Sequence, residues 1–398
     1  MPMLLDHERV WAHLRVLCEE IGPRLSGTPG DERAVRYIAG VFRRSGAQTE
    51  VQDFPCPSWE HEATELTLLG EAGPEPLDAV AQTFTEGCDL EAPLAVVANR
   101  RELDFEPDLE GKALVLVGEA ATRINVDRNP TLLSAEERRP AALVVVSPTA
   151  AVSTKLIRDP FLRVPAVAVA PSVGERLRQC GDRLVRLRIR ARRYASTGHT
   201  VIGRIPGDEP EHLTVAAHYD TAAGVAGATD NASGTAVVLA LCEAFSAAGR
   251  RRFGIDFVAY GAEEYGRHAG NLGAVEYVRR NPVAVRQTRA VIEVDCVGTV
   301  AGPPIVHVLG WPSERRQEKE RALDLLRPLP NWTVHDRSEH PSARTAFHLP
   351  DVPALAFLDD YSRLPIHTAL DTIDLMRPAA LDAAAEAVAA VIGNLSSP

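Results

Sequence analysis

The sequence predicts an α/β protein with a largely parallel sheet, interrupted by an inserted β-rich segment. Two observations indicate this class. From about residue 205 onwards, short apolar strands alternate with helices, which is the order of a parallel sheet covered by helices. Before that point, short β-rich runs follow one another with Gly, Pro and charged turns between them. With 398 residues and 45% apolar content, the chain is long enough for two or three domains.

The N-terminal part predicts two helices and one strand. Residues 10–21 follow the pattern of an amphipathic helix, which Gly22 and Pro23 end. Residues 31–45 carry apolar side chains at helical spacing, and residues 49–54 alternate like a strand.

The remaining elements fall into two groups. Apolar runs in the β-rich segment predict strands at 66–69, 94–97, 113–117, 142–146, 166–169 and 184–189. Beyond it, we expect strands at 213–217, 253–260, 290–294 and 352–358, and helices at 235–247, 271–280 and 381–394.

The charge of the chain argues against two classes of partner. Its net charge is −11, and its basic runs are short. We therefore expect no nucleic-acid partner and no membrane partner. The sequence leaves the oligomeric state open.

The cysteines and the first residues bear on location. None of the six cysteines forms a Cys-x-x-Cys pair, and several lie among apolar residues, where Cys is usually a small buried hydrophobe. The first ten residues lack the apolar core of a secretory signal. We expect a reduced cytoplasmic protein, or a secreted one if a signal has been removed.

Metal-binding side chains follow three of the predicted strands. His218, the pair Glu263-Glu264 and Asp295 stand just past strand ends, at the edge where sites form in open α/β sheets. Acidic and imidazole groups that converge there would stay unpaired or repel one another without a cation. A bound metal resolves this cost, although each residue alone also fits an ordinary surface or strand-end role.

Asp220 and Asp230 add further carboxylates near His218. Asp220 lies two residues after His218, where a carboxylate can hold the second ring nitrogen of a metal-bound imidazole. Asp230 begins the sequence Asp-Asn-Ala-Ser-Gly. Taken alone, Asp230 is better explained as a helix N-cap, but the small residues after it would also leave its carboxylate free to bridge two ions.

Two acidic neighbours and a later histidine complete the set. Adjacent carboxylates at a strand end point in different directions, so Glu264 is the candidate ligand and Glu263 the candidate general base. His367, in a Pro-Ile-His-Thr sequence, would supply the imidazole that the other residues lack.

These motifs, in this order, resemble the co-catalytic di-zinc exopeptidases of the aminopeptidase S and aminopeptidase Y type. The resemblance covers most of residues 8–60 and 198–396 and rests on His-x-Asp, Gly-Ala-x-Asp-Asn-Ala-Ser-Gly, Glu-Glu, the strand-end Asp and His-Thr-x-x-Asp-Thr. It implies a three-layer α/β/α zinc-exopeptidase fold with a mixed, largely parallel sheet. Its discontinuous peptidase domain would comprise residues 1–62 and 198–398. Residues 63–197 are similar to the protease-associated domain inserted in many of these enzymes.

The resemblance also implies roles for the candidate residues. Asp230 would bridge two zinc ions, with His218 and Asp295 completing one site and Glu264 and His367 the other. Cobalt or manganese could replace zinc. Glu263 would take the proton of the attacking water and pass it to the leaving amine, so the substrate would be a peptide or a small acyl-amino acid.

The chain departs from its relatives around the ligands. In many of them a Tyr that steadies the oxyanion precedes the last His, whereas this chain has Ile366. Tyr361 in the same loop is the candidate replacement. His340 stands in a Ser-Glu-His sequence where Ser-Asp-His is common, and it is a candidate substrate contact.

Four functions remain in contention on these residues. A zinc aminopeptidase that releases N-terminal amino acids leads. A dipeptidase or amino-acid deacylase could use the same site. A glutaminyl cyclase shares the fold but differs after the bridging Asp, and a non-catalytic binding protein would have lost ligands that this chain retains.

Overall fold

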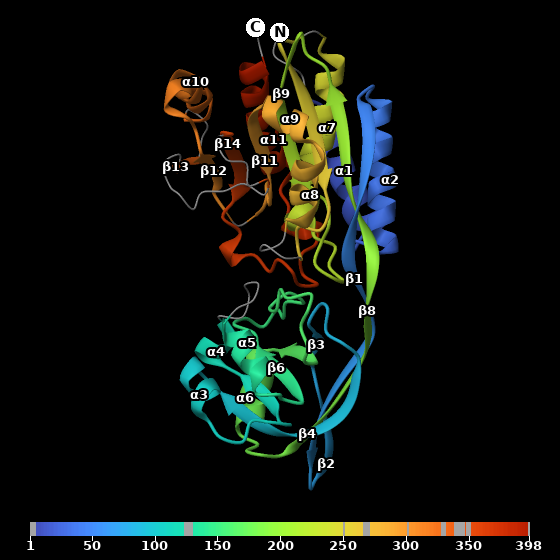
Figure 1. Ribbon diagram of the computed structural model, residues 1–398, viewed down its shortest axis with the longest axis vertical. Helices are drawn as coiled ribbons and strands as arrows, with labels where there is room; N and C mark the ends of the chain where they lie inside the picture. Colours follow the sequence, from blue (N-terminus) through green and yellow to red (C-terminus); the bar gives the residue numbers. More distant parts are fainter. Residues whose placement is uncertain are drawn as a thin grey trace.

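The computed structural model describes residues 5–396, apart from 123–129, 250, 266–270, 301, 328–331, 338–346 and 348–351. The chain forms two lobes joined by a long two-stranded ribbon (Figure 1). The larger lobe holds both termini and the predicted ligands, and the smaller lobe is the insert. One hydrogen-bonded sheet continues through both lobes.

The larger lobe contains a mixed sheet whose centre is parallel. Its strands are the end of β8 (Leu184–Ile205), β9 (Glu209–His218), β10 (Phe253–Tyr260), β11 (Thr288–Val294), β12 (Pro304–Leu309), β13 (Thr333–Arg337) and β14 (Ala354–Asp359). Parallel pairs join β9 to β10, β9 to β11 and β11 to β14, while β8 and β12 pair antiparallel at the two sides.

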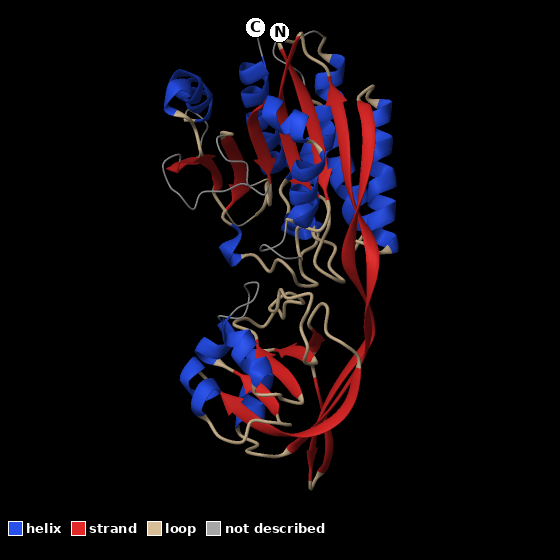
Figure 2. Ribbon diagram, viewed as in Figure 1, coloured by secondary structure: helices blue, strands red, loops and turns tan. Residues whose placement is uncertain are grey.

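Helices cover both faces of this sheet, as Figure 2 shows. One face packs into a core with α1 (His7–Arg15), the π-helical turn Val16–Ile21, α2 (Pro29–Arg44), α7 (Ser233–Ala247), α10 (Arg316–Leu326) and α11 (Pro378–Ser396). The other face packs against α8 (Leu272–Arg280), which α9 (Pro282–Gln287) follows. The predicted three-layer α/β/α fold with a mixed sheet is confirmed.

The last helix, α11, is long and apolar enough to cross a membrane by length and composition, with a mean hydropathy of 1.3. Half of that window is buried inside the structure. Leu381, Val388 and Ile392 lie in the same core as the sheet, which is how the core helix of a globular domain packs.

The ribbon consists of β1 (Gln48–Gly70) and β8 (Leu184–Ile205), which pair antiparallel along most of their lengths. We expected two short strands, 49–54 and 66–69, on either side of the boundary at 62/63, and a strand that ended at residue 189, before the boundary at 197/198. Instead each strand runs unbroken from one lobe into the other, because cross-strand pairing continues through both points. The only register irregularity of this pair lies between His61 and Ala63.

The insert is not purely β. Its strands β4 (Cys88–Val97), β5 (Ala113–Leu116), β6 (Ala142–Val146) and β7 (Ala166–Val169) are parallel neighbours, with β2 (Gly73–Leu77) and β3 (Val80–Ala81) at the edges. Short helices accompany them: α3 (Arg100–Phe105), α4 (Gly118–Thr122), α5 (Pro130–Glu137) and α6 (Pro171–Arg178). These helices are too short to leave a clear helical period in the sequence.

A buried carboxyl ties α2 to the end of β9. Asp31 accepts hydrogen bonds from the Tyr219 hydroxyl at 2.7 Å and from the Gly27 backbone N–H at 2.9 Å. Its side chain is fully buried, and burial raises the pKa of this carboxyl to about 6.

Replacing Asp31 by Asn is expected to change how stability depends on pH. Between pH 4 and 6 the folded wild type holds a proton on Asp31 that the unfolded chain has released, so Asp31 makes the folded state less stable as pH rises. The free energy of unfolding of Asp31→Asn, relative to wild type, should therefore rise by about 2 kcal/mol from pH 4 to pH 7. Denaturant titrations at both pH values measure this change. An Asp324→Asn control on exposed α10 should show no such rise, and an identical pH dependence for Asp31→Asn and wild type would refute the prediction.

Candidate metal centre

The predicted ligands meet at the carboxyl edge of the parallel strands. β9 ends at His218, Glu263 and Glu264 follow β10, and Asp295 follows β11. His367 arrives from the loop after β14. Since these strands are parallel neighbours, their ends deliver the side chains to one place.

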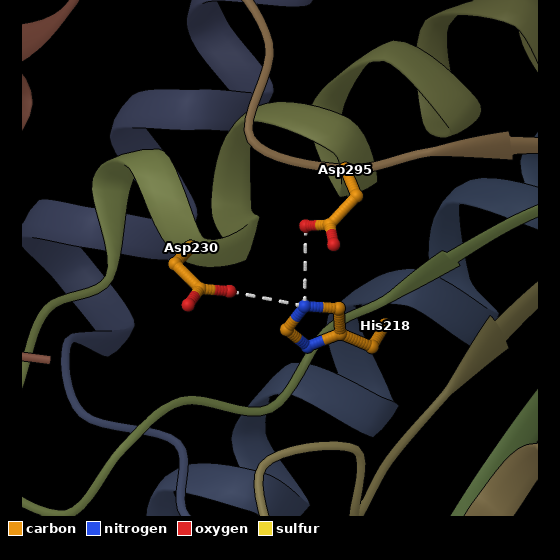
Figure 3. Close-up of side chains that lie close together, drawn as sticks. All are labelled: His218, Asp230 and Asp295. Carbon is orange, nitrogen blue, oxygen red and sulfur yellow. Dashed lines mark ion pairs between the residues drawn. The ribbon is translucent and has the colours of Figure 1, made fainter. Parts of the chain in front are cut away.

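One half of the centre consists of His218, Asp230 and Asp295 (Figure 3). The Nε2 atom of His218 lies 3.1 Å from Oδ1 of Asp230 and 3.4 Å from Oδ1 of Asp295. Burial lowers the pKa of His218, but Asp220 and the two carboxylates in front of it outweigh burial and raise that pKa well above its ordinary value. The surroundings of this imidazole therefore favour a positive charge.

The other half consists of Asp230, Glu264 and His367. The Nε2 atom of His367 lies 2.8 Å from Oδ2 of Asp230 and 3.3 Å from Oε2 of Glu264. Asp230 thus faces one imidazole with each of its oxygens. Burial alone would raise the pKa of Asp230, yet His218 and His367 hold it well below its ordinary value.

Both half-sites fit a zinc ion. Each combines one imidazole with two carboxylates, a donor set that zinc accepts. The atoms Oδ1 of Asp295 and Nε2 of His367 are buried, and their close contacts with the facing groups do not have hydrogen-bond geometry, so neither makes a hydrogen bond within the described part of the chain. Unsatisfied donor or acceptor atoms are rare in buried positions, and a bound cation would supply their partner.

The backbone around Asp230 keeps its carboxylate free. Asp230 and Asn231 have non-helical backbone angles, and α7 begins only at Ser233. The N-cap residue of α7 is Ala232, and Oδ1 of Asn231, one residue earlier, accepts the Gly234 N–H of the first turn at 2.9 Å. The interpretation of Asp230 as the helix cap is therefore wrong. A Cβ at Gly234 would lie 2.2 Å from the Val294 carbonyl oxygen, so this turn requires glycine.

Asp371 fixes the backbone at Asp230. Its carboxylate accepts the backbone N–H groups of Thr229 at 2.8 Å and Asp230 at 3.2 Å. Asp371 was part of the His-Thr-x-x-Asp-Thr motif, but the sequence did not reveal this role, because the two segments are 141 residues apart.

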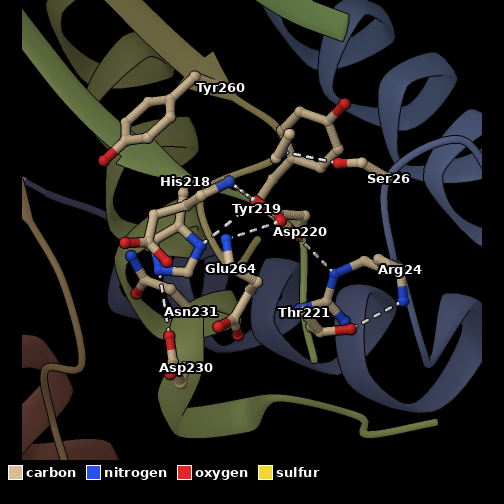
Figure 4. Close-up of polar contacts among 12 residues, drawn as sticks. Arg24, Ser26, His218, Tyr219, Asp220, Thr221, Asp230, Asn231, Tyr260 and Glu264 are labelled. Atoms are coloured by element: carbon tan, nitrogen blue, oxygen red, sulfur yellow. Dashed lines mark hydrogen bonds and ion pairs between the residues drawn. The ribbon is translucent and has the colours of Figure 1, made fainter. Parts of the chain in front are cut away.

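Asp220 organises the loop of the two glutamates (Figure 4). Its two oxygens accept the backbone N–H groups of Glu263 at 3.1 Å and Glu264 at 3.2 Å. Its Oδ1 lies 3.5 Å from Nδ1 of His218, where we expected its main contact. Its closest contacts therefore go to the Glu263-Glu264 backbone.

Arg24 is a buried support that the sequence analysis missed. Its fully buried guanidinium donates to the backbone carbonyls of Tyr219 and Ala226, each at 2.8 Å, and to three further carbonyls (Figure 4). These bonds hold the backbone near both ends of the loop between His218 and Asp230. A single arginine near a Gly-Pro turn carries no sequence signal for such a role.

A cavity of about 220 Å³ opens beside Glu263 and Asp295. Tyr361 lines it, as do Tyr260 and Glu293, and the Tyr260 hydroxyl donates to Glu293 at 2.7 Å. The candidate replacement for the missing tyrosine therefore lies at the centre. His340, the other candidate substrate contact, falls outside the described residues.

The insert also reaches the centre, through a residue to which the sequence analysis assigned no role. The ammonium of Lys155 contacts Oε2 of Glu264 and lies 3.9 Å from Oε2 of Glu263. Its side chain is 2% exposed, and burial lowers its pKa to about 8. The chain has only three lysines, but that scarcity did not indicate which of them would be buried.

Comparison with known proteins places this centre among relatives. The chain is 26% identical over 308 residues to "Aminopeptidase YwaD" of Bacillus subtilis, covering 75% of this chain and 63% of that protein. It is 24% identical over 268 residues to "Probable lipoprotein aminopeptidase LpqL" of Mycobacterium tuberculosis, covering 65% and 51%. The chain thus spans less than two thirds of the length of either relative.

Solved structures share the fold over nearly the whole chain. The "Peptidase M28 precursor" from Shewanella amazonensis has a TM-score of 0.80 at 19% identity, covering 98% of this chain and 93% of that one. A glutaminyl cyclase from Porphyromonas gingivalis has a TM-score of 0.52 at 13% identity, covering 98% of each chain.

The family comparison covers the part of the chain in which all five candidate ligands lie. Residues 200–392 match the model described as "Peptidase family M28". The domain that carries the centre therefore belongs to peptidase family M28.

Proposed function

We propose that the protein is a zinc-dependent aminopeptidase that releases N-terminal amino acids from peptides. The observation that carries this proposal is Asp230, whose two oxygens each face one imidazole Nε2. A carboxylate in this position suits the bridge of a two-metal hydrolytic site. The names of the two curated relatives, both aminopeptidases, support the same activity.

His218, Asp230 and Asp295 would hold one zinc ion, and Asp230, Glu264 and His367 the other. When bound, the pair supplies Lewis-acid polarisation of the scissile carbonyl and lowers the pKa of the attacking water. Asp230 fixes the spacing of the two half-sites, since it belongs to both.

Glu263 acts as the general base. Its backbone N–H is held by Asp220, while its side chain lines the cavity beside Asp295. Its carboxylate takes a proton from the attacking water and delivers it to the leaving amine. Tyr361, on the same cavity, is the candidate donor to the oxyanion in place of the tyrosine that Ile366 replaces.

The same cavity suits the amino terminus of a substrate. Glu263, Glu293 and Asp295 all line it, so its wall is rich in carboxylates. A protonated α-amine would be stabilised there by opposite charge, whereas an acetylated amine would lose that attraction.

The test uses zinc-loaded protein and a peptide with its free and its acetylated N-terminus, with products identified by mass spectrometry. We expect stepwise loss of single N-terminal residues from the free peptide alone. Cleavage of the acetylated peptide at equal rate would favour a deacylase, and loss of ammonia from an N-terminal Gln would favour a glutaminyl cyclase. No turnover of any substrate despite full zinc loading would favour a binding protein. Each of these results would refute the proposal that the protein is an aminopeptidase.

A further inference from the structure

The insert presents a tightly held loop, residues 153–157, to the metal centre. Gln82 accepts the backbone N–H groups of Leu156 at 2.8 Å and Ile157 at 3.0 Å, and its amide donates to the Ser153 carbonyl at 3.0 Å. The backbone N–H of Thr83 donates to the Thr154 carbonyl at 3.0 Å. These bonds fix the backbone on either side of Lys155.

This loop is also bound to the larger lobe. The Thr154 N–H donates to the His367 carbonyl at 3.0 Å. The hydroxyl of Tyr265, the residue after Glu264, donates to Thr83 at 2.8 Å. Both connections join the loop to segments that carry candidate ligands, so the position of Lys155 is set relative to the centre.

A metal ion would need the atom that Lys155 contacts. Oε1 of Glu264 already accepts the Ala222 N–H at 3.0 Å. Oε2, which faces His367, is the oxygen left for an ion, and it is the oxygen that Lys155 contacts. Once an ion takes Oε2, the nearest carboxylate to the buried ammonium among the described residues is that of Glu263 at 3.9 Å, and the ammonium also lies over the Tyr265 ring, 5.4 Å from its centroid. A buried charge without a close carboxylate is costly.

A second cation from the insert lies nearby. The Nε atom of Arg158 is buried and has no hydrogen-bond partner among the residues that the structure describes. After burial, the charge of Arg158 contributes most to lowering the pKa of Lys155. Arg158 forms no ion pair with any carboxylate in the part of the chain that the structure describes.

Lys155 and Arg158 are cations that the insert brings to this side of the centre. Once an ion has taken Oε2 of Glu264, neither has a carboxylate partner closer than the 3.9 Å between Lys155 and Glu263 among the described residues. Buried cations in this position attract an anionic group of a ligand.

We propose that Lys155 and Arg158 form a subsite for a substrate carboxylate located within one residue of the scissile bond. The distance from the scissile bond to this subsite is short because Lys155 contacts a candidate metal ligand. One extended residue spans only about 3.3–3.6 Å. The carboxylate is either the C-terminus of a dipeptide or the side chain of an Asp or Glu after the scissile bond. The inference rests on the proposed function and names the substrate class for it.

The test compares kcat/KM of zinc-loaded protein for Leu-Leu, Leu-Leu-amide and Leu-Asp-amide. Wild type should favour at least one carboxylate-bearing substrate over Leu-Leu-amide by about tenfold or more, because hydrogen bonds to charged groups contribute at this level. The first substrate identifies the C-terminus as the source, and the third identifies the side chain.

The variants assign the preference to the two cations. Lys155→Met, which keeps the side-chain length, and Arg158→Met should each lower, by about tenfold, the ratio of kcat/KM for the preferred carboxylate-bearing substrate to kcat/KM for Leu-Leu-amide. Lys112→Met, at a lysine of the insert that pairs with Asp108, should leave the preference unchanged. Zinc content of each variant, measured by atomic emission, shows that the centre is intact.

If wild type cleaved all three substrates at equal rates, the inferred carboxylate subsite would be refuted, while the proposed aminopeptidase activity would be supported. A Lys155→Met variant that slows all three substrates equally would also overturn it, since Lys155 would then act on the centre and not on the carboxylate. The absence of any cleavage by zinc-loaded wild type would overturn the proposed function and the inference with it.

Discussion

Replacement of Glu263 by Gln is expected to lower kcat by about 10²–10⁴-fold, the range contributed by general acid–base catalysis. Glutamine retains the shape of the side chain but cannot take up the proton of the attacking water. The position of the residue is set by its backbone bond to Asp220 at 3.1 Å, which the substitution leaves in place. KM and zinc content should therefore change little.

Glu264→Gln provides the matched comparison for this experiment. The two glutamates are neighbours, but only Glu264 lies within a candidate ligand group. Measured by steady-state kinetics and metal analysis, Glu264→Gln should weaken zinc binding, whereas Glu263→Gln should not. If Glu263→Gln kept wild-type kcat, or lost zinc as Glu264→Gln does, the assignment of Glu263 as the base would be wrong.

Replacement of Asp230 by Ala is expected to lower the affinity of both half-sites for zinc and to abolish activity. The reason is geometric, since Oδ1 of Asp230 lies 3.1 Å from His218 Nε2 and its Oδ2 lies 2.8 Å from His367 Nε2. Loss of a group that merely supports a ligand costs about 10–100-fold in metal affinity, and loss of a shared ligand should cost at least as much at each half-site.

Asp295→Ala is the control that separates the two half-sites. Asp295 belongs to the His218 group alone. This variant should therefore lower the zinc affinity of that half-site and leave the affinity of the other unchanged. Titration calorimetry with zinc measures both affinities. Equal zinc binding by Asp230→Ala and Asp295→Ala would mean that Asp230 is not shared.

The strand-end residues were predictable because their chemistry is local. An apolar strand followed by His, Glu-Glu or Asp indicates where each side chain leaves the sheet, and parallel strands bring those ends together. For this reason the α/β fold and three of the converging residues, His218, Glu264 and Asp295, could be inferred from strand ends alone, whereas Asp230 and His367 were assigned only as members of the whole set. The sequence could not show which side chain bonds to the first turn of α7, because Asp and Asn both favour helix starts and Asp230 and Asn231 are adjacent. Only the bonds of Asn231 to Gly234 and of Asp371 to the Asp230 backbone decide between them.

The class of fold and the strand-end ligands follow from the order of residues alone, since both depend on periodicity and on residue types at strand ends. The tertiary structure decided which side chains surround those ligands. Lys155 and Glu264 are 109 residues apart, and one of them belongs to the insert. Their contact depends on how the unbroken β1–β8 ribbon and the bonds of the 153–157 loop orient one lobe against the other. No local pattern encodes that orientation, because it arises from packing between segments distant in the chain.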